Sequence, residues 1–148
     1  MTSPIQVKAL GEIAIRCGDL APMVAFYRDV IGLPVLLDSS ETGIVFFRIA
    51  DGYAGHTTVL ALFLPDAGRP ALHPHGTSAP YTGPQSSFHH MALSVDYDQQ
   101  DAITQWLDEM GIEFRVQEFD WIGWRGVFVK DPEGNTVELV AAKPKLDQ

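Results

Sequence analysis

Two stretches of the chain carry apolar residues at the spacing of an α-helix. The first, residues 19–32, starts at Asp19, which can cap a helix, has Pro22 in the tolerant first turn and stops at Gly32. Its apolar residues follow the i, i+3, i+4, i+7, i+8 spacing of one helix face: Met23, Phe26, Tyr27, Val30 and Ile31. The second stretch, residues 98–111, repeats this design and also ends at a glycine; its apolar residues are Ile103, Trp106, Leu107 and Met110. The sequence therefore predicts two amphipathic helices.

Strand-like segments surround both predicted helices in the same order. Each helix follows one such segment and precedes three more, so the order strand, helix, strand, strand, strand occurs twice. The two halves also match by eye, because residues 43–52 align with residues 125–134. This pattern predicts an α+β protein built from two βαβββ modules.

A proline-rich segment lies between the two halves. Residues 65–87 contain five prolines together with glycines and serines, a composition that breaks helices and strands. We therefore predict a single domain over residues 1–148, with module 1 at residues 8–64, a linker at residues 65–87 and module 2 at residues 88–142.

Three predicted strands carry an ionisable residue on a face that also holds small side chains. Strand alternation places Glu12, His90 and Glu138 in such positions, one on each strand, opposite a mainly apolar face. A regular strand would point His89 away from His90, so we interpret His89 as structural. Small neighbours leave room for a ligand beside each ionisable group.

Composition and charge narrow the possible classes of protein. A chain of 148 residues with 46% hydrophobic and 20% charged residues is typical of one globular domain. No apolar run approaches the roughly 20 residues of a membrane helix, and residues 1–8 do not resemble a signal peptide. The single cysteine, Cys17, cannot form an internal disulfide, so we expect a cytoplasmic protein. The net charge of −9 repels phosphate backbones and anionic lipid, which argues against nucleic-acid and membrane partners.

Three sequence segments together resemble a known superfamily. They are FYRDVIGL at residues 26–33, HHMA at residues 89–92 and DPEGNTVEL at residues 131–139. These segments are similar to those of the vicinal oxygen chelate superfamily, which includes glyoxalases, bleomycin resistance proteins and extradiol dioxygenases. The resemblance implies that paired modules form a curled mixed sheet around a metal-binding cleft, with the helices outside.

The resemblance also implies a set of metal ligands on the first and fourth strands of the modules. His90 and Glu138 match the expected positions, whereas Glu12 stands where these proteins usually have His or Gln. The remaining ligand is missing, because the aligned positions are Leu60 or Ala61. His56 lies four or five residues earlier, so it would reach the metal only through a bulge or a folded loop. We expect one divalent cation, Zn, Ni, Fe or Mn, held by Glu12, His90 and Glu138.

Two tryptophans and an arginine come close to the start of the seventh predicted strand. Trp121 and Trp124 could wall an apolar substrate pocket, or they could pack beneath the linker. Arg125 could orient a substrate carboxylate, or it could pair with surface acids. The residues expected in the substrate pocket are therefore His56, Trp121, Trp124 and Arg125.

The expected site favours proton-transfer chemistry on a small oxygenated substrate. Three protein ligands leave positions open for that substrate, and Glu12 or Glu138 could move its proton as the catalytic carboxylate. Extradiol ring cleavage is the second enzymatic interpretation. It ranks below proton transfer because Glu12 would add a negative charge to the site that these dioxygenases use for ferrous iron. A metal-free small-molecule-binding protein, similar to bleomycin resistance proteins, is the third. We also expect a homodimer.

Overall fold

The computed structural model describes residues 2–67 and 81–145. The chain divides into two compact units, Met1–Pro80 and Tyr81–Gln148. Much of the predicted linker, residues 68–80, lies outside the described residues.

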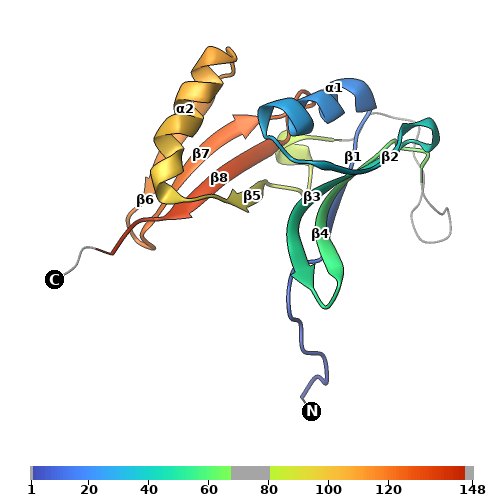
Figure 1. Ribbon diagram of the computed structural model, residues 1–148, viewed down its shortest axis with the longest axis horizontal. Helices are drawn as coiled ribbons and strands as arrows, with labels where there is room; N and C mark the ends of the chain where they lie inside the picture. Colours follow the sequence, from blue (N-terminus) through green and yellow to red (C-terminus); the bar gives the residue numbers. More distant parts are fainter. Residues whose placement is uncertain (1, 68–80, 146–148) are drawn as a thin grey trace. The chain divides into compact units, whose positions relative to one another are not determined.

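The first unit is a four-stranded mixed sheet in the order β1-β4-β3-β2. Strands β1 and β4 run parallel, and the other neighbours are antiparallel. Helix α1 (Leu20–Ala25) continues into a π-helical turn, Phe26–Val30, and lies over one face of the sheet (Figure 1). The strands are β1 (Glu12–Arg16), β2 (Val35–Ser39), β3 (Ile44–Tyr53) and β4 (His56–Phe63).

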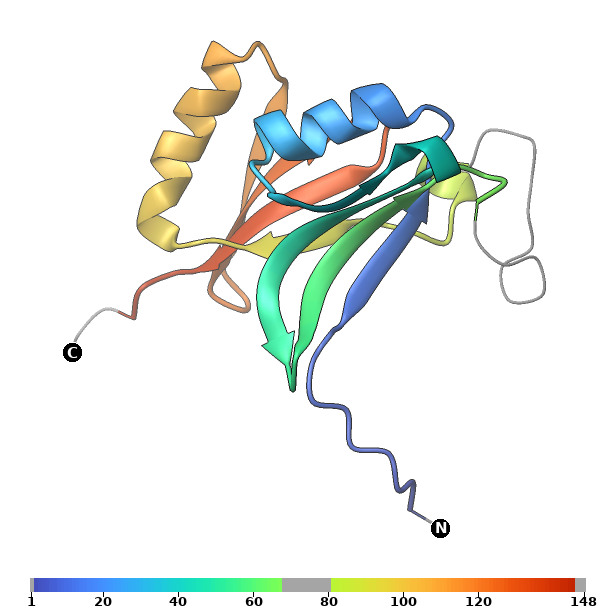
Figure 2. The ribbon, with the colours of Figure 1, turned by 45° about the vertical axis from the view of Figure 1, so that its right-hand side comes forward.

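The second unit repeats this topology strand for strand. Its order is β5-β8-β7-β6, with a parallel β5–β8 pair and antiparallel neighbours elsewhere. Helix α2 (Gln100–Glu109) lies along one face of this sheet (Figure 2). The strands are β5 (Met91–Ser94), β6 (Phe114–Phe119), β7 (Trp124–Lys130) and β8 (Thr136–Ala142). The predicted α+β fold of repeated βαβββ modules is confirmed, and neither mixed sheet closes into a barrel.

Both predicted helices form, and their ends follow the residues that the sequence indicates. The side chain of Asp19 accepts a hydrogen bond from the Ala21 amide and caps α1. Gly32 and Gly111 follow the two helices with φ of 84° and 68°, the left-handed conformation that glycine adopts without a Cβ clash. The π-helical turn was not predicted; its Ile31 amide donates to the Phe26 carbonyl oxygen, five residues earlier.

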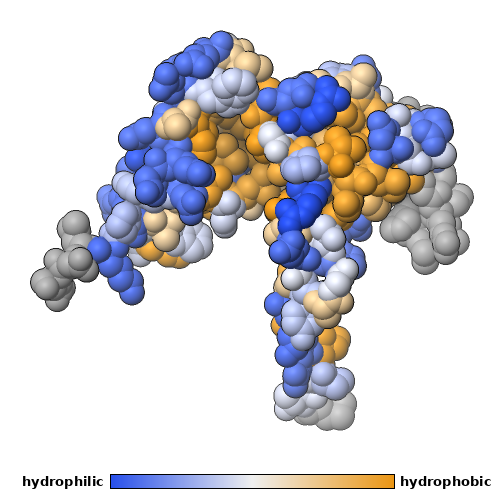
Figure 3. Space-filling model, viewed as in Figure 1, coloured by the Kyte–Doolittle hydropathy of each residue, from blue (hydrophilic) through white to orange (hydrophobic). Residues whose placement is uncertain are grey.

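Each unit has its own apolar core between the helix and one sheet face. Met23, Tyr27 and Phe47 are fully buried in the first unit, and Leu107 and Val137 are buried in the second. The outer side of α2 is hydrophilic (Figure 3). None of the described helices is long and apolar enough to cross a membrane. In the second unit, the sheet face that points away from α2 carries the candidate site residues, which the next subsection describes.

Candidate metal centre

His90 and Glu138 lie side by side in the second unit. The Nε2 atom of His90 is 3.1 Å from Oε2 of Glu138. His90 immediately precedes β5, and Glu138 is the third residue of β8, the parallel neighbour of β5, where it pairs in register with Ala92. The side chain of Glu138 is 7% exposed, whereas that of His90 is 34% exposed. The pairing of two strands therefore brings together two of the three predicted ligands.

Gly126 on β7 makes room for the Glu138 carboxylate. A Cβ atom at Gly126 would lie 2.4 Å from Oε1 of Glu138 and 2.8 Å from Cε2 of Phe128. Because real Cβ atoms do not approach so closely, no other residue fits here without moving the carboxylate. The buried position of Glu138 thus depends on a glycine that the sequence analysis did not single out.

Strand alternation predicted that His89 points away from His90, but the structure brings the two side chains into contact. The Nδ1 atom of His89 lies 2.7 Å from Nδ1 of His90, and the two ring centroids are 5.0 Å apart. Strand β5 begins only at Met91, so alternation does not govern the two histidines before it. One Nδ1 atom must donate in this contact; donation by His90 leaves its Nε2 lone pair free on the side of Glu138.

The donor atoms of this pair fit two ligands of one divalent cation. Ligands that meet at right angles about 2.1 Å from a metal are about 3.0 Å apart, close to the observed 3.1 Å between Nε2 and Oε2. A neutral imidazole and a carboxylate also form a ligand set common to zinc, iron, nickel and manganese. Within either unit, no three His, Cys, Asp or Glu side chains gather among residues 2–67 and 81–145.

The other predicted ligand and the uncertain histidine both belong to the first unit. Glu12 is exposed at the start of β1, where it pairs in register with Val59. The ring of His56 lies against Gly11, whose added Cβ would be 3.1 Å from the ring Cε1 atom. His56 thus packs beside the backbone of the residue that precedes Glu12.

The strand registers identify the first-unit counterpart of Glu138. Ala92 pairs with Glu138 in the second unit, and the equivalent Ala14 pairs with Ala61 in the first. Of the two positions aligned by sequence, Leu60 and Ala61, the register therefore selects Ala61. Because Ala61 has no side-chain ligand atom, β4 offers no metal ligand at this position.

A chain of aromatic contacts leads from His90 along the same sheet face. The rings of His90 and Phe128 are 6.2 Å apart between centroids, those of Phe128 and Phe119 are 6.2 Å apart, and those of Phe119 and Trp121 are 6.5 Å apart. Trp124 shares the face of Phe128 by alternation. Trp121 and Trp124 are 82% and 45% exposed. Sequence reasoning missed Phe119 and Phe128, although the alternation of β7 could have indicated Phe128.

Arg125 lies on the helix-facing side of β7. One guanidinium nitrogen donates to Oδ1 of Asp101 on α2 at 3.1 Å, and the group lies 5.5 Å above the Tyr97 ring. Hydrogen bonding to Tyr97, and then to Asp101, raises the pKa of Arg125 above its usual value. Arg125 alternates with Gly126, so it points away from the Glu138 face. Of the two roles expected for Arg125, orienting a substrate carboxylate or pairing with a surface acid, the structure shows the pairing with a surface acid.

The sequence as a whole matches a described superfamily. Residues 9–139 match the glyoxalase/bleomycin resistance protein/dioxygenase superfamily. The chain belongs to this superfamily. This confirms the family resemblance carried by the motifs around His90 and Glu138. No curated protein matches the sequence.

Solved structures of the superfamily resemble this chain along nearly its whole length. Lactoylglutathione lyase from Agrobacterium tumefaciens is 26% identical, with a TM-score of 0.70 over 94% of this chain and 96% of that one. A glyoxalase/dioxygenase from Nostoc punctiforme is 23% identical, with a TM-score of 0.66 over 98% and 97% of the two chains. A mutant of the fosfomycin resistance protein FosX from Listeria monocytogenes is 17% identical, with a TM-score of 0.64 over 93% of each chain. That protein was solved with Mn(II) and 1S,2S-dihydroxypropylphosphonic acid. The likenesses at 23% and 17% identity show the fold alone.

Proposed function

We propose that this protein is a metal-dependent, glyoxalase-like lyase or isomerase that moves a proton on a small oxygenated substrate. One observation carries the proposal: a nearly buried carboxylate, Glu138, lies 3.1 Å from Nε2 of His90 in space that Gly126 leaves open. Similarity to lactoylglutathione lyase at 26% identity supports the same class of chemistry.

His90 and Glu138 would hold the divalent cation, and we propose Glu12 as the third ligand. When bound, such an ion polarises neighbouring substrate oxygens and lowers the cost of forming an enediolate. Three protein ligands leave positions for those oxygens. Zinc, nickel, iron and manganese all suit one imidazole and two carboxylates.

The residues of the chain would handle the proton. In the proposed reaction a carboxylate oxygen of Glu138 removes the proton from the hydroxyl-bearing carbon beside the substrate carbonyl and returns it to the former carbonyl carbon, while the hydroxyl proton passes to the former carbonyl oxygen. With 7% exposure, the Glu138 carboxylate is largely shielded from bulk water, which favours return of the proton to the substrate. His89 orients the His90 ring through the contact between their Nδ1 atoms. Glu12 is the second candidate for the catalytic carboxylate.

A metal-free binding protein is the second candidate function. Ala61 occupies the register position of Glu138 in the first unit and offers no ligand atom, which favours a site with fewer metal ligands. Metal binding by the isolated protein separates the two functions.

The deciding experiment measures metal binding by protein purified without a polyhistidine tag. We expect one divalent cation per chain by elemental analysis after dialysis against zinc, nickel or manganese. His90→Ala and Glu138→Gln should each weaken binding about tenfold or more, since each removes a ligand. Glu12→Gln tests the third ligand, and Glu109→Gln, an exposed carboxylate on α2, is the matched control. Wild-type protein without bound metal would contradict the enzymatic proposal and favour the metal-free binder.

The type of reaction is tested by proton exchange without oxygen. On a panel of hydroxy-carbonyl and thioester-like compounds in deuterated buffer, metal-loaded protein should isomerise or exchange the proton next to the carbonyl under nitrogen. Activity should persist with zinc or nickel, because proton transfer needs no redox ion. Cleavage of catechols that requires both oxygen and iron would instead identify an extradiol dioxygenase.

A further inference from the structure

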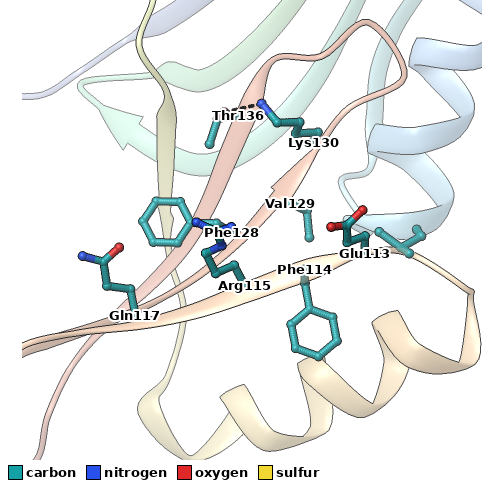
Figure 4. Close-up of a pocket in the computed structure, with 9 residues that line it drawn as sticks. Glu113, Phe114, Arg115, Gln117, Phe128, Val129, Lys130 and Thr136 are labelled. Carbon is teal, nitrogen blue, oxygen red and sulfur yellow. Dashed lines mark hydrogen bonds between the residues drawn. The ribbon is translucent and has the colours of Figure 1, made fainter. Parts of the chain in front are cut away.

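A hollow opens in the second unit beside the His90–Glu138 pair. It has a volume of about 500 Å³, and strands β6, β7 and β8 supply most of its lining (Figure 4). Phe128, whose ring contacts that of His90, also lines the hollow. The pair and the hollow are therefore neighbours within one compact unit.

Strand register places two cations of this hollow on the face that carries Glu138. Phe128 pairs with Glu138 on one side and with Arg115 on the other, so these three residues form a row across β8, β7 and β6. In the row beside it, Lys130 pairs with Thr136. Paired residues project from the same face of a sheet, so all five side chains leave β6, β7 and β8 on one side.

Figure 4 shows the direction of these side chains. Phe114, at the start of β6, points to the side opposite Gln117. The Lys130 ammonium reaches the Thr136 hydroxyl, with Nζ 3.4 Å from Oγ1. Lys130 and Thr136 thus gather two hydrogen-bonding groups at one end of the hollow.

The two cations of the hollow lack acidic partners. Neither Arg115 nor Lys130 forms an ion pair with any residue in the described part of the chain, although Glu113 also lines the hollow. Elsewhere in the unit, Arg125 pairs with Asp101, and Lys143 pairs with two acids. In a chain of net charge −9, two cations in one hollow that form no ion pair are a local exception.

We propose that this hollow binds the anionic end of the substrate, a carboxylate, phosphate or phosphonate group. The proposal rests on the proposed function, since it places the oxygenated carbons of the same molecule at His90 and Glu138. The Arg115 guanidinium offers a planar fork of donors for an oxyanion, and Lys130 and Thr136 offer an ammonium and a hydroxyl. The Phe128 ring lies between the His90–Glu138 pair and Arg115, where it suits a short carbon chain of the substrate. The substrate class is therefore a small, negatively charged hydroxy-carbonyl compound.

Anion binding can be measured without the metal and without the substrate. Uniformly ¹⁵N-labelled full-length protein, freed of metal on a chelating resin, is titrated with methylphosphonate and followed by amide NMR spectra. The uncharged dimethyl ester of methylphosphonate is the matched probe. We expect saturable shifts at the amides of Arg115, Phe128 and Thr136 with methylphosphonate, in the millimolar range typical of a fragment of about five heavy atoms. We expect no saturable shifts with the ester.

The variants test whether the two cations cause this binding. The double variant Arg115→Gln/Lys130→Gln should weaken methylphosphonate binding about tenfold or more, because it removes two charge-assisted contacts. The control Lys8→Gln/Lys145→Gln removes the same charge outside the hollow and should leave binding within about twofold. Equal weakening in both double variants, equal binding of the ester, or no saturable shift in the hollow would overturn the proposal. Because neither double variant alters His90 or Glu138, metal binding can fail while anion binding holds, and the reverse also applies.

Discussion

Glu138 keeps a buried carboxylate next to an imidazole because one neighbour has no side chain. At Gly126 an added Cβ would come within 2.4 Å of the carboxylate oxygen and 2.8 Å of the Phe128 ring. The carboxylate and the Phe128 ring therefore both occupy the space beside Gly126 that a side chain would need. The position of the proposed ligand is set by packing as well as by its contact with His90.

Replacing this glycine should disturb the site more than the fold. We expect Gly126→Ala to displace the Glu138 carboxylate or the Phe128 ring, lower the free energy of unfolding by about 1–3 kcal/mol and weaken metal binding about tenfold. Denaturant unfolding and metal titration measure the two effects separately.

A second glycine provides the control for this prediction. Gly123 has a φ of 74° and nothing within 4 Å of an added Cβ. Gly123→Ala should lower stability by about 1 kcal/mol through backbone strain and leave metal affinity unchanged. If both variants bind metal like the wild type, Gly126 does not position the ligand.

The sequence predicted which residues lie together better than it predicted their surroundings. The proximity of His90 and Glu138 followed from motifs and strand alternation, because both signals are local. The contact of His89 with His90 did not follow, since it depends on where β5 begins. The role of Gly126 did not follow either, because a glycine in a strand indicates a close approach without identifying the approaching group.

Helix α2 is tied to its sheet by a buried amide. The side chain of Gln100, fully buried, donates to the backbone carbonyl oxygens of Arg125 at 2.8 Å and Leu139 at 3.1 Å. One residue at the start of the helix thus bridges β7 and β8. Its own Oε1 atom is buried without a hydrogen-bond partner in the described structure.

Removing this amide should loosen the helix from the sheet. Gln100→Leu withdraws two hydrogen bonds and also removes the unpaired Oε1 atom, so we expect a net loss of about 1 kcal/mol in the free energy of unfolding. Denaturant unfolding measures it. Gln105→Leu on the exposed side of α2 should change stability by less than about 0.5 kcal/mol. A Gln100→Leu protein more stable than the wild type would show that relief of the unpaired oxygen outweighs the lost bonds.

Both helices were predictable because their apolar spacing and terminal glycines are repeating, local features. The π-helical turn after α1 was not, since one extra residue in a turn leaves the apolar stripe nearly unchanged. Trp106 and Met110 also belong to the predicted apolar stripe of α2, yet they are 42% and 43% exposed. Periodicity identifies the apolar face of a helix, but the width of the sheet beneath it decides how much of that face is buried.

At the scale of the whole molecule, we propose a homodimer. An apolar run lies exposed on β2, an edge strand: Val35, Leu36 and Leu37 are 39%, 50% and 48% exposed. Such runs on an edge strand are typical of interaction surfaces.

Sedimentation of the untagged protein measures its mass in solution. We expect a particle of about twice the chain mass of 16.3 kDa at micromolar concentration. Leu36→Lys should shift the equilibrium towards the monomer, because a charge would be buried in the interface. Val116→Lys, at an apolar residue of β6 with 40% exposure, should leave the mass unchanged. A single species of one chain mass in the wild type would contradict the homodimer.

The two halves fill corresponding positions with complementary volumes. Glu138 and Gly126 of the second unit correspond in register to Ala61 and Ile44 of the first. A large side chain stands next to a small one in both places, but the order is reversed. A carboxylate introduced by Ala61→Glu alone would meet Ile44, and Ile44→Gly alone would leave a void. A second copy of this ligand therefore needs two coordinated mutations, and each single intermediate is expected to fold less stably than either end point. Such epistasis is a barrier to placing the same ligand in both halves.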